Sequence, residues 1–393
     1  MKKEPADFKD IALQNEKLVI ALLRRHGVMS QTQLRKLSGL SMSTSSYIIA
    51  RLRNKGYILE TKGESKKRGA KPVNLQIDPN GCFAIGIEIK TDSVLAGLFD
   101  FNANLIGEIS EPATDTSPDS MAIIVKKCVE FLVEEYQQAQ GKIAGVGIAI
   151  SGSIRDDGVV VLSSPLGWKN VAFKHKLTEI IDLPVNVYTT EVRMLAEMDM
   201  EAPQTNMIYI NIGNGVGGHV ILDGNLCHGA TGRIGEIGHV VVDPDGDICG
   251  CGNKGCLETL ISGRAIAAKI KSDMSSGNYP ELQGFVKKDD LPETVVSRWG
   301  SRLESGCKYS EQLASEISAS LSDVVCMMVN ICDPEIITLA GYVSDSCFGY
   351  LKTSLLEAFK TKVYNYSERK FAVVKAKAGI HALIKGAAIS VLK

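Results

Sequence analysis

Three cysteines lie close together in a glycine-rich stretch: Cys249, Cys251 and Cys256. Glycines at positions 246, 250, 252 and 255 let the backbone turn tightly there, so that three thiolates can converge on one ion. A tetrahedral zinc ion needs a fourth ligand, and His239, ten residues before Cys249, is the best candidate. We therefore predict one structural zinc ion per chain, held by His239, Cys249, Cys251 and Cys256. The alternative is three reduced cysteines with a purely structural role.

The rest of the composition is that of an ordinary globular protein. The chain has 393 residues, 45% hydrophobic and 23% charged, which is too long for one hydrophobic core, so we expect two or three domains. No apolar run reaches the roughly 18 residues needed to cross a bilayer, and the N-terminus leads into no secretory signal, so we expect a cytoplasmic protein with reduced thiols. Seven further cysteines are expected to be structural: Cys82, Cys128, Cys227, Cys307, Cys326, Cys332 and Cys347.

The net charge of −1 conceals a strong asymmetry along the chain. Residues 1–75 hold 16 Lys and Arg against 6 Asp and Glu, a net charge of +10, whereas the remainder holds 28 against 39, a net charge of −11. A basic N-terminal module on an acidic body is typical of a nucleic-acid-binding domain attached to another domain. Solvated basic helices are common, however, so the pattern within the segment has to decide.

The pattern of the first 75 residues predicts a winged helix-turn-helix. Apolar residues at 18 and 20–23 predict an amphipathic helix that Gly27 closes. Ser30 is a good N-cap for a second helix over 31–38, whose buried face would carry Leu34 and Leu37. After a turn at 39–41, a third helix is expected over about 42–54, ended by Gly56 in a left-handed conformation. Its inward residues would be Ile48, Ile49 and Leu52.

Two extended runs, 57–61 and 72–77, flank a basic tip at 62–71 that would form the wing. Hydroxyl and basic side chains on the third helix suit base edges and phosphates in the major groove, and arginine with glycine in the wing suits a narrow minor groove. The expected contacts to double-stranded DNA are Gln31, Thr32, Ser43, Thr44, Ser45, Tyr47, Arg51, Lys67, Arg68, Gly69 and Lys71. The alternative is a winged helix used only for protein contacts.

Beyond residue 83 a strand–turn–strand pattern occurs twice, at 84–107 and at 207–227, about 120 residues apart. Between the copies we expect a helix over about 120–138 and a strand over 143–150. A long helix is expected over 310–332, with one apolar stripe: Leu313, Ile317, Leu321, Val324, Met328 and Ile331. The pattern predicts a duplicated α/β fold in two lobes, which resembles the actin-like ATPase and sugar kinase architecture with a nucleotide cleft between the lobes.

Two motifs resemble the signature of the ROK family of repressors and sugar kinases. They are Gly235-Glu236-Ile237-Gly238-His239 and Cys249-Gly-Cys251-Gly-x-x-Gly-Cys256-Leu-Glu258. With the winged helix added, the chain resembles the repressor branch of that family. The fold class is therefore α/β, with a winged helix-turn-helix over 1–78 and a ROK sugar-kinase-like body over 79–393, including a zinc loop at 239–256.

The resemblance implies that His239 binds zinc and also contacts sugar, and that Glu236 and Glu258 bind sugar hydroxyls. Zinc on one imidazole nitrogen would fix the ring and leave the other nitrogen for a hydroxyl. The alternative for Glu236 is a structural helix cap. The resemblance also places Ser164 at a sugar-contacting position.

Kinases of this family carry glycines in a first phosphate loop, but the matching stretch here, residues 88–92, has none. In the second loop, 213–218, Asn214 replaces the family's threonine. The catalytic aspartate of the family falls on Thr190, which cannot act as a general base near neutral pH. A shift of the alignment by one residue would place Glu191 there. Thr189, Thr190 and Glu191 stay candidate sugar contacts, and we expect no enzyme activity.

The leading interpretation is a DNA-binding transcriptional repressor of carbohydrate genes, controlled by a sugar or sugar phosphate. One alternative is an active ATP-dependent hexose kinase with an attached DNA-binding domain, and another is a regulator controlled by a protein partner. A single winged helix contacts only a few base pairs, so we expect a homodimer or higher homo-oligomer on an inverted-repeat operator.

Overall fold

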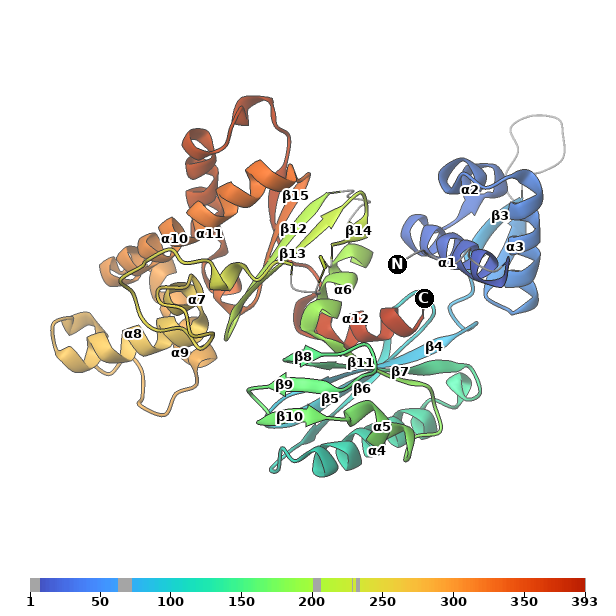
Figure 1. The fold of residues 1–393 in the computed structure, drawn as a ribbon, viewed down its shortest axis with the longest axis horizontal. Coiled ribbons are helices and arrows are strands. Elements are labelled where there is room, and N and C mark those ends of the chain that lie inside the picture. The colour runs from blue at the N-terminus through green and yellow to red at the C-terminus, as the bar shows by residue number, and fades with distance from the viewer. Residues whose placement is uncertain (1–7, 63–72, 201–205, 228, 231–233, 393) are drawn as a thin grey trace. The chain divides into compact units, whose positions relative to one another are not determined.

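The computed structural model describes residues 8–62, 73–200, 206–227, 229–230 and 234–392. The chain divides into two compact units. The first unit comprises residues 1–202 and 378–393, and the second comprises residues 203–377. Each unit is built around its own sheet (Figure 1).

The N-terminal domain, α1 to β3, has the predicted order of elements. Three helices, α1 (Phe8–His26), α2 (Gln31–Ser38) and α3 (Met42–Asn54), accompany a small antiparallel sheet of β1 (Met29–Ser30), β3 (Val73–Ile77) and β2 (Ile58–Lys62). This is a winged helix-turn-helix, and the prediction of that fold is confirmed.

Local chemistry fixes the ends of α2 and α3. The Ser30 hydroxyl accepts a hydrogen bond from the Gln33 backbone, and the Gln33 side chain accepts one from the Ser30 backbone, which completes a capping box. At the end of α3, Gly56 adopts φ +73°, Gly56 N–H donates to Arg53 O, and Tyr57 N–H donates to Leu52 O. This double closure is the Schellman motif, which Gly56 permits because it has no Cβ.

Two residues in this domain differ in burial from the prediction. Leu34 is buried, but Leu37 is 51% exposed, so α2 buries a narrower stripe than we expected. Ser45 was assigned to the outer face of α3, yet it is only 1% exposed. The reason is helical spacing, because Ser45 precedes Ile48, Ile49 and Leu52 by three, four and seven residues and shares their face.

The core of the N-terminal domain is continuous with the core of the body in the first unit. Buried Val19 and Leu23 of α1 belong to the same apolar cluster as Phe101 and, from the C-terminal helix, Ile384 and Leu392. The guanidinium of Arg24 lies over the Phe101 ring, 5.7 Å from its centroid, and Nε donates to Phe101 O at 3.2 Å. The N-terminal domain therefore packs directly against the body of the first unit, and the linker is not the sole connection between them.

The two units contain sheets of the same topology, which confirms the predicted duplication. Read from corresponding edges, the strand order is β11-β7-β4-β5-β6 in the first sheet and β16-β15-β12-β13-β14 in the second. In each, the first strand of the repeat pairs antiparallel with the second strand and parallel with the strand that follows the intervening helical segment. The strands are β4 (Phe83–Ile89), β5 (Ser93–Phe99), β6 (Leu105–Pro112), β7 (Ile143–Ile150), β11 (Val185–Thr189), β12 (Met207–Ile212), β13 (Val216–Leu222), β14 (Asn225–Leu226), β15 (Ile336–Ala340) and β16 (Ala372–Lys375).

Helices cover the first sheet, and a small sheet of β8 (Ser153–Ile154), β9 (Val160–Ser163) and β10 (Trp168–Val171) lies beside it. The C-terminal helix α12 packs directly on β4, where a Cβ at Gly86 would lie 1.8 Å from Ile384 O. Only glycine permits this approach. The helices are α4 (Pro118–Glu135), α5 (Phe173–Thr178), α6 (Arg193–Met200) and α12 (Ala382–Val391).

The second unit surrounds its sheet with α7 (Glu258–Ile261), α8 (Gly263–Ser276), α9 (Pro292–Glu304), α10 (Lys308–Cys332) and α11 (Tyr342–Lys362). By length and composition, α10 is the one helix among the described residues that could cross a membrane, but half of its apolar window is buried within the unit. Most of its predicted stripe is buried, except that Ile331 is 74% exposed. The stripe leaves the core in the last turn of the helix.

Candidate metal, effector and DNA sites

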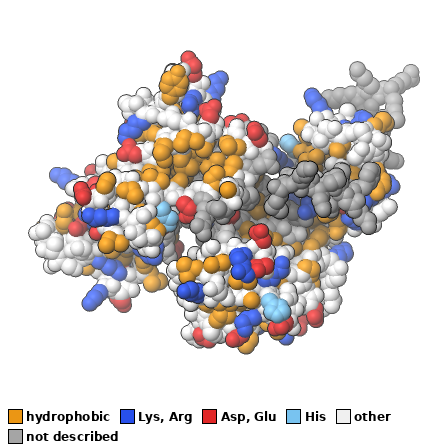
Figure 2. Space-filling model, viewed as in Figure 1, with side chains coloured by type: hydrophobic (Ala, Val, Ile, Leu, Met, Phe, Trp, Pro, Cys, Tyr) orange, Lys and Arg blue, Asp and Glu red, His pale blue; other side chains and the backbone are white. Residues whose placement is uncertain are grey.

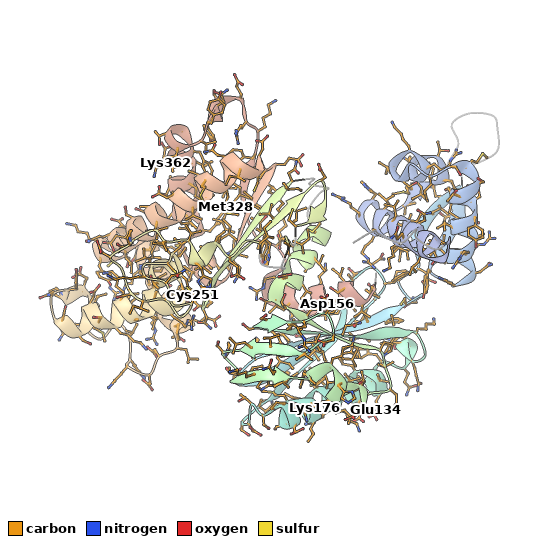
Figure 3. All side chains as sticks on the ribbon, viewed as in Figure 1. Glu134, Asp156, Lys176, Cys251, Met328 and Lys362 are labelled. Carbon is orange, nitrogen blue, oxygen red and sulfur yellow. The ribbon has the colours of Figure 1, made fainter. Side chains whose placement is uncertain are left out.

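The cysteine loop brings four predicted metal ligands together. One ligand atom each from His239, Cys249, Cys251 and Cys256 lies within 4.8 Å of the others. The Cys251 and Cys256 sulfurs are 3.7 Å apart, and the Cys249 sulfur lies 3.6 Å from His239 Nδ1. Cys251 marks this loop in Figure 3.

The backbone of the loop is forced into this shape at Gly255, which has φ +71°. A Cβ at Gly255 would lie 1.4 Å from Asp243 O, so no other residue fits. Isolated bridges pair Val241 with Cys256 and Ile248 with Lys254. The loop is therefore folded on itself, with Cys249 and Cys256 buried and Cys251 exposed at its surface.

The spacing of the donor atoms fits one tetrahedral ion. Metal–sulfur bonds of about 2.3 Å and metal–nitrogen bonds of about 2.0–2.1 Å give tetrahedral edges of about 3.8 Å between sulfurs and about 3.6 Å between sulfur and nitrogen. The two distances above match these edges. Burial, followed by hydrogen bonding of the Cys256 thiol with Cys251 and Cys249, raises the pKa of that thiol to about 12. A bound cation reverses that preference, because it stabilises thiolates.

His239 has one nitrogen on each side of this cluster. Nδ1 faces the Cys249 sulfur, and Nε2 lies 3.9 Å from Glu236 Oε2. The Glu236 side chain is 61% exposed and makes no capping hydrogen bond to the short 3-10 helix Ile237–His239 that follows it. Its carboxylate is accordingly placed to accept from a ligand hydroxyl together with the ring.

Glu258 lies at the start of α7, two residues after the last cysteine, and its side chain is mostly buried. Oε2 accepts a hydrogen bond from Val216 N–H at 2.9 Å, and Oε1 lies 3.5 Å from an Arg264 nitrogen. One oxygen is thus committed to the loop after β12. Oε1 forms an ion pair with the Arg264 guanidinium.

The remaining sugar candidates belong to the first unit. Thr189 ends β11, and its hydroxyl accepts a hydrogen bond from Glu191 N–H at 3.4 Å, which starts a 3-10 turn. Thr190 and Ser164 are exposed, whereas Glu191 is half-buried. These residues therefore occupy a strand end and a turn of one unit, and Glu236, His239 and Glu258 occupy the other unit.

The stretch that matches the first phosphate loop is a tight hairpin between β4 and β5. Lys90 N–H donates to Ser93 O at 2.9 Å, and Lys90 Nζ lies 3.8 Å from Glu88 Oε2. Burial raises the pKa of the Glu88 carboxyl, and the charge of Lys90 partly opposes that shift. The hairpin carries no open glycine loop.

The candidate DNA-contacting residues on α2 and α3 differ in their exposure to solvent. Thr32, Ser43 and Tyr47 are exposed, and Gln31 and Thr44 are partly exposed. Ser45 faces the core, so it does not belong to an outward DNA-contacting face. The wing candidates Lys67, Arg68, Gly69 and Lys71 lie outside the described residues.

Arg51 is held by a charge network that the sequence did not predict. Its Nε lies 2.6 Å from Glu16 Oε1, and Lys55 Nζ lies 2.7 Å from Glu16 Oε2. Arg51 also donates to the Tyr47 hydroxyl at 3.2 Å. Glu16 is only 3% exposed, so α1 orients two basic side chains of α3 through one buried carboxylate.

Comparison with known families agrees with this geometry. Residues 84–393 match the ROK family, and residues 13–58 match a winged helix-turn-helix DNA-binding family. The first match spans well over half of the chain, and it contains both the cysteine loop and the two sheets.

Several similar proteins are named as repressors. The xylose repressor of Caldicellulosiruptor bescii is 27% identical over 335 residues, which cover 84% of this chain and 83% of that protein. The xylose repressor of Bacillus subtilis is 24% identical, covering 73% and 75%. The N-acetylglucosamine repressor of Escherichia coli is 22% identical, covering 89% and 87%.

Solved structures show the same fold. A ROK family transcriptional regulator, a homologue of the Escherichia coli MLC protein, superposes with a TM-score of 0.81 at 22% identity, covering 97% of this chain and 96% of that chain. A ROK glucokinase from Streptomyces griseus, in complex with glucose and AMPPNP, gives a TM-score of 0.65 at 23% identity and covers 78% of this chain and 98% of that one. This chain therefore belongs to the ROK family, and it carries a winged helix-turn-helix domain before the ROK body.

Proposed function

We propose that this protein is a sugar-responsive transcriptional repressor. The N-terminal domain binds an operator, and a sugar or sugar phosphate bound by the body lowers its affinity for DNA. The observation that carries the proposal is the presence, in one chain, of a capped helix-turn-helix and a ROK body whose His239 and Glu236 lie side by side. The relatives named for xylose and N-acetylglucosamine support an effector among the sugars.

The effector is recognised by hydroxyl-binding groups. Glu236 and Glu258 Oε1 accept hydrogen bonds from sugar hydroxyls, and His239 Nε2 forms a further bond. Thr189, Thr190, Glu191 and Ser164 supply further contacts from the first unit. A ligand that binds one conformation of the body more tightly than another shifts the protein toward that conformation, and this is how it lowers the affinity of the N-terminal domain for DNA.

The metal is zinc, and its role is structural. A set of three thiolates and one imidazole is the donor chemistry that zinc prefers. When bound, the ion supplies the positive charge that holds the thiolates together. The chain's own contribution is to fix the His239 ring through Nδ1, so that Nε2 points toward the Glu236 side.

The body does not transfer phosphate. A threonine at 190 offers no base for the sugar hydroxyl, and the β4–β5 hairpin presents Lys90 and Thr91 where a phosphate loop needs glycine amides. The similarity to repressors over most of the chain supports the same reading.

We place the protein in the cytoplasm. Binding to the operator requires two copies of the chain. Hydrophobic side chains gather on one face of the second unit, over the region of α10, α11 and β15 (Figure 2). Met327 and Ile331 of α10 are 44% and 74% exposed, and Tyr364, whose N–H donates to Asn330 Oδ1, is 74% exposed. An exposed apolar patch of this kind supports a symmetric dimer, in which a second copy covers it, on an inverted repeat.

A panel of monosaccharides and their phosphates tests the proposal. One of them should raise the melting temperature and release an operator fragment in a mobility-shift assay, because a ligand specific to the native state stabilises it. Glu236→Gln should abolish the shift in melting temperature and leave the metal content unchanged. Operator binding that persists while no sugar shifts the melting temperature would contradict the effector assignment and favour control by a protein partner.

A further inference from the structure

The glycine-rich loop between β12 and β13, Gly213-Asn214-Gly215-Val216-Gly217-Gly218, has the composition of a phosphate-binding loop. Such loops hold phosphate with unengaged backbone amides that point into a concavity. Three of the amides here are already engaged. Gly213 N–H donates to Gly215 O at 2.9 Å, Val216 N–H donates to Glu258 Oε2 at 2.9 Å, and Gly218 N–H donates to Gly235 O at 2.8 Å.

A carboxylate occupies the middle of the loop. Glu258 Oε2 packs so closely on Gly215 that a Cβ there would lie 2.7 Å from it. The Glu258 side chain is only 19% exposed, so water screens its charge poorly. Arg264 lies 3.5 Å from Oε1, but Oε2 faces the loop and repels a phosphate at the same place. The first reason for excluding phosphate is therefore electrostatic.

Tyr342 closes the loop from the other side. It follows Gly341, which has φ +90° and approaches the end of β12 so closely that a Cβ would lie 2.4 Å from Ile212 O. The Tyr342 hydroxyl donates to Asn214 Oδ1 at 2.7 Å. Burial, with a contribution from Glu293, raises the pKa of Tyr342 to about 12, so the hydroxyl stays a neutral donor at physiological pH.

The ring and hydroxyl of Tyr342 fill the space beside two glycines. A Cβ at Gly263, the first residue of α8, would lie 2.0 Å from the Tyr342 hydroxyl oxygen, and a Cβ at Gly213 would lie 3.8 Å from its ring. Arg264 adds a third tie, because its Nε–H donates to Asn214 O at 2.7 Å. Side chains from α7, α8 and α11 thus converge on a loop of six residues.

We propose that Tyr342 is the residue that excludes nucleotides from the second unit, its side chain standing where the phosphates of a nucleoside triphosphate would meet the loop. The loop requires its glycines because Glu258 and Tyr342 occupy the space that a phosphate would otherwise occupy. The loop thereby becomes a fixed joint between α7, α8 and α11. The body responds to its effector without a nucleotide. This exclusion does not depend on the identity of the effector or on DNA binding.

The test compares Tyr342→Ala with Tyr350→Ala, a matched change on the same helix, where the Tyr350 hydroxyl donates to Glu311 O at 3.5 Å. The probe is a fluorescent ATP analogue with Mg²⁺, followed by anisotropy in the full-length chain and displaced by unlabelled ATP. Tyr342→Ala should bind at least tenfold more tightly than the wild type and Tyr350→Ala. Tyr342→Phe, which keeps the ring, should bind no better than the wild type.

Wild-type protein that binds the probe as tightly as Tyr342→Ala would overturn the proposal. So would a folded Tyr342→Ala protein that binds no better than the wild type, or Tyr342→Phe that binds as well as Tyr342→Ala. Circular dichroism and zinc content establish that each variant is folded. Tyr342→Ser, which suits a helix start, replaces the alanine variant if that protein does not fold.

Discussion

The Nε of Arg51 lies 2.6 Å from the buried carboxylate of Glu16, so the last turn of α3 is tied to α1 by an ion pair. Lys55, one turn later, uses the other oxygen of the same carboxylate. Both cations are about two-fifths exposed while Glu16 is not. The carboxylate therefore orients two groups that can still reach a phosphate.

Glu16→Gln should weaken operator binding and lower the free energy of unfolding by about 1–2 kcal/mol, because Arg51 and Lys55 lose a buried partner but can turn to water. Denaturant unfolding and mobility-shift titration measure the two effects. Glu60→Gln, which removes only the exposed 3.4 Å pair with Arg53, is the control and should change stability by about 0.5 kcal/mol or less. Equal effects of the two variants would contradict an orienting role for Glu16.

Ser43 and Ser45 make a matched pair for testing which face of α3 meets DNA. Ser43→Ala should weaken operator binding about three- to tenfold, which corresponds to one lost hydrogen bond. Ser45→Ala should leave DNA affinity unchanged and keep or slightly raise stability, because its buried hydroxyl has no hydrogen-bond partner among the described residues. A stronger loss of affinity for Ser45→Ala than for Ser43→Ala would reverse the assignment.

Cys251→Ala should remove the metal and lower the melting temperature, since formation of the site and folding of the loop are coupled. Elemental analysis of the wild type should find about one zinc per chain. A chelator should destabilise the wild type but not the variant. Cys332→Ala, outside the cluster, is the control and should keep its zinc. Wild-type protein purified without any bound metal would contradict the site.

Ile331→Glu should shift the protein from dimer to monomer, because it places a charge in the exposed apolar patch of α10. Light scattering gives the mass, and the free energy of unfolding of the monomer should be little changed. Ile123→Glu is the matched control, since Ile123 is 67% exposed on α4 of the first unit. A dimer that survives Ile331→Glu excludes this patch as the interface.

We expect no hexose phosphorylation above background in a coupled ATP assay. Thr190 stands at the position of the general base, and the exclusion of nucleotide by Tyr342 leads to the same expectation. If sugar phosphate does form, Glu191→Gln decides its origin. Activity lost in that variant would show that the alignment shifted by one residue is the correct one.

The N-terminal domain could be predicted closely because its signals are local. Ser30 and Gly56 set helix ends through bonds to residues a few positions away, and the structure confirms both. Leu37 and Ile331 were placed wrongly because a helical stripe says which residues share a face but not how far a neighbour covers it. Ser45 was a missed signal, since its spacing to Ile48 and Leu52 already placed it inside.

The metal cluster could be predicted from spacing, but the closed loop could not. The four metal ligands lie within 18 residues and share one motif. Asn214, Glu258 and Tyr342 come from three separate elements, and no pattern in the chain links them. The glycines of the loop pointed to phosphate, whereas the fold uses them to seat a carboxylate and a phenol. The sequence shows that the loop is rich in glycine, but only the tertiary structure shows which side chains occupy the space beside the glycines.

The packing of the C-terminal helix α12 into one core with α1 has a consequence for folding during synthesis. Ile384 and Leu392 belong to the cluster that also holds Val19 and Leu23 of α1, so α1 completes its packing only after α12 has been synthesised. A chain still on the ribosome, before α12 has emerged, therefore has an N-terminal domain with an incomplete core. We expect a variant that lacks α12 to hold its N-terminal domain, and α3 with it, less firmly and to bind the operator more weakly than the intact chain.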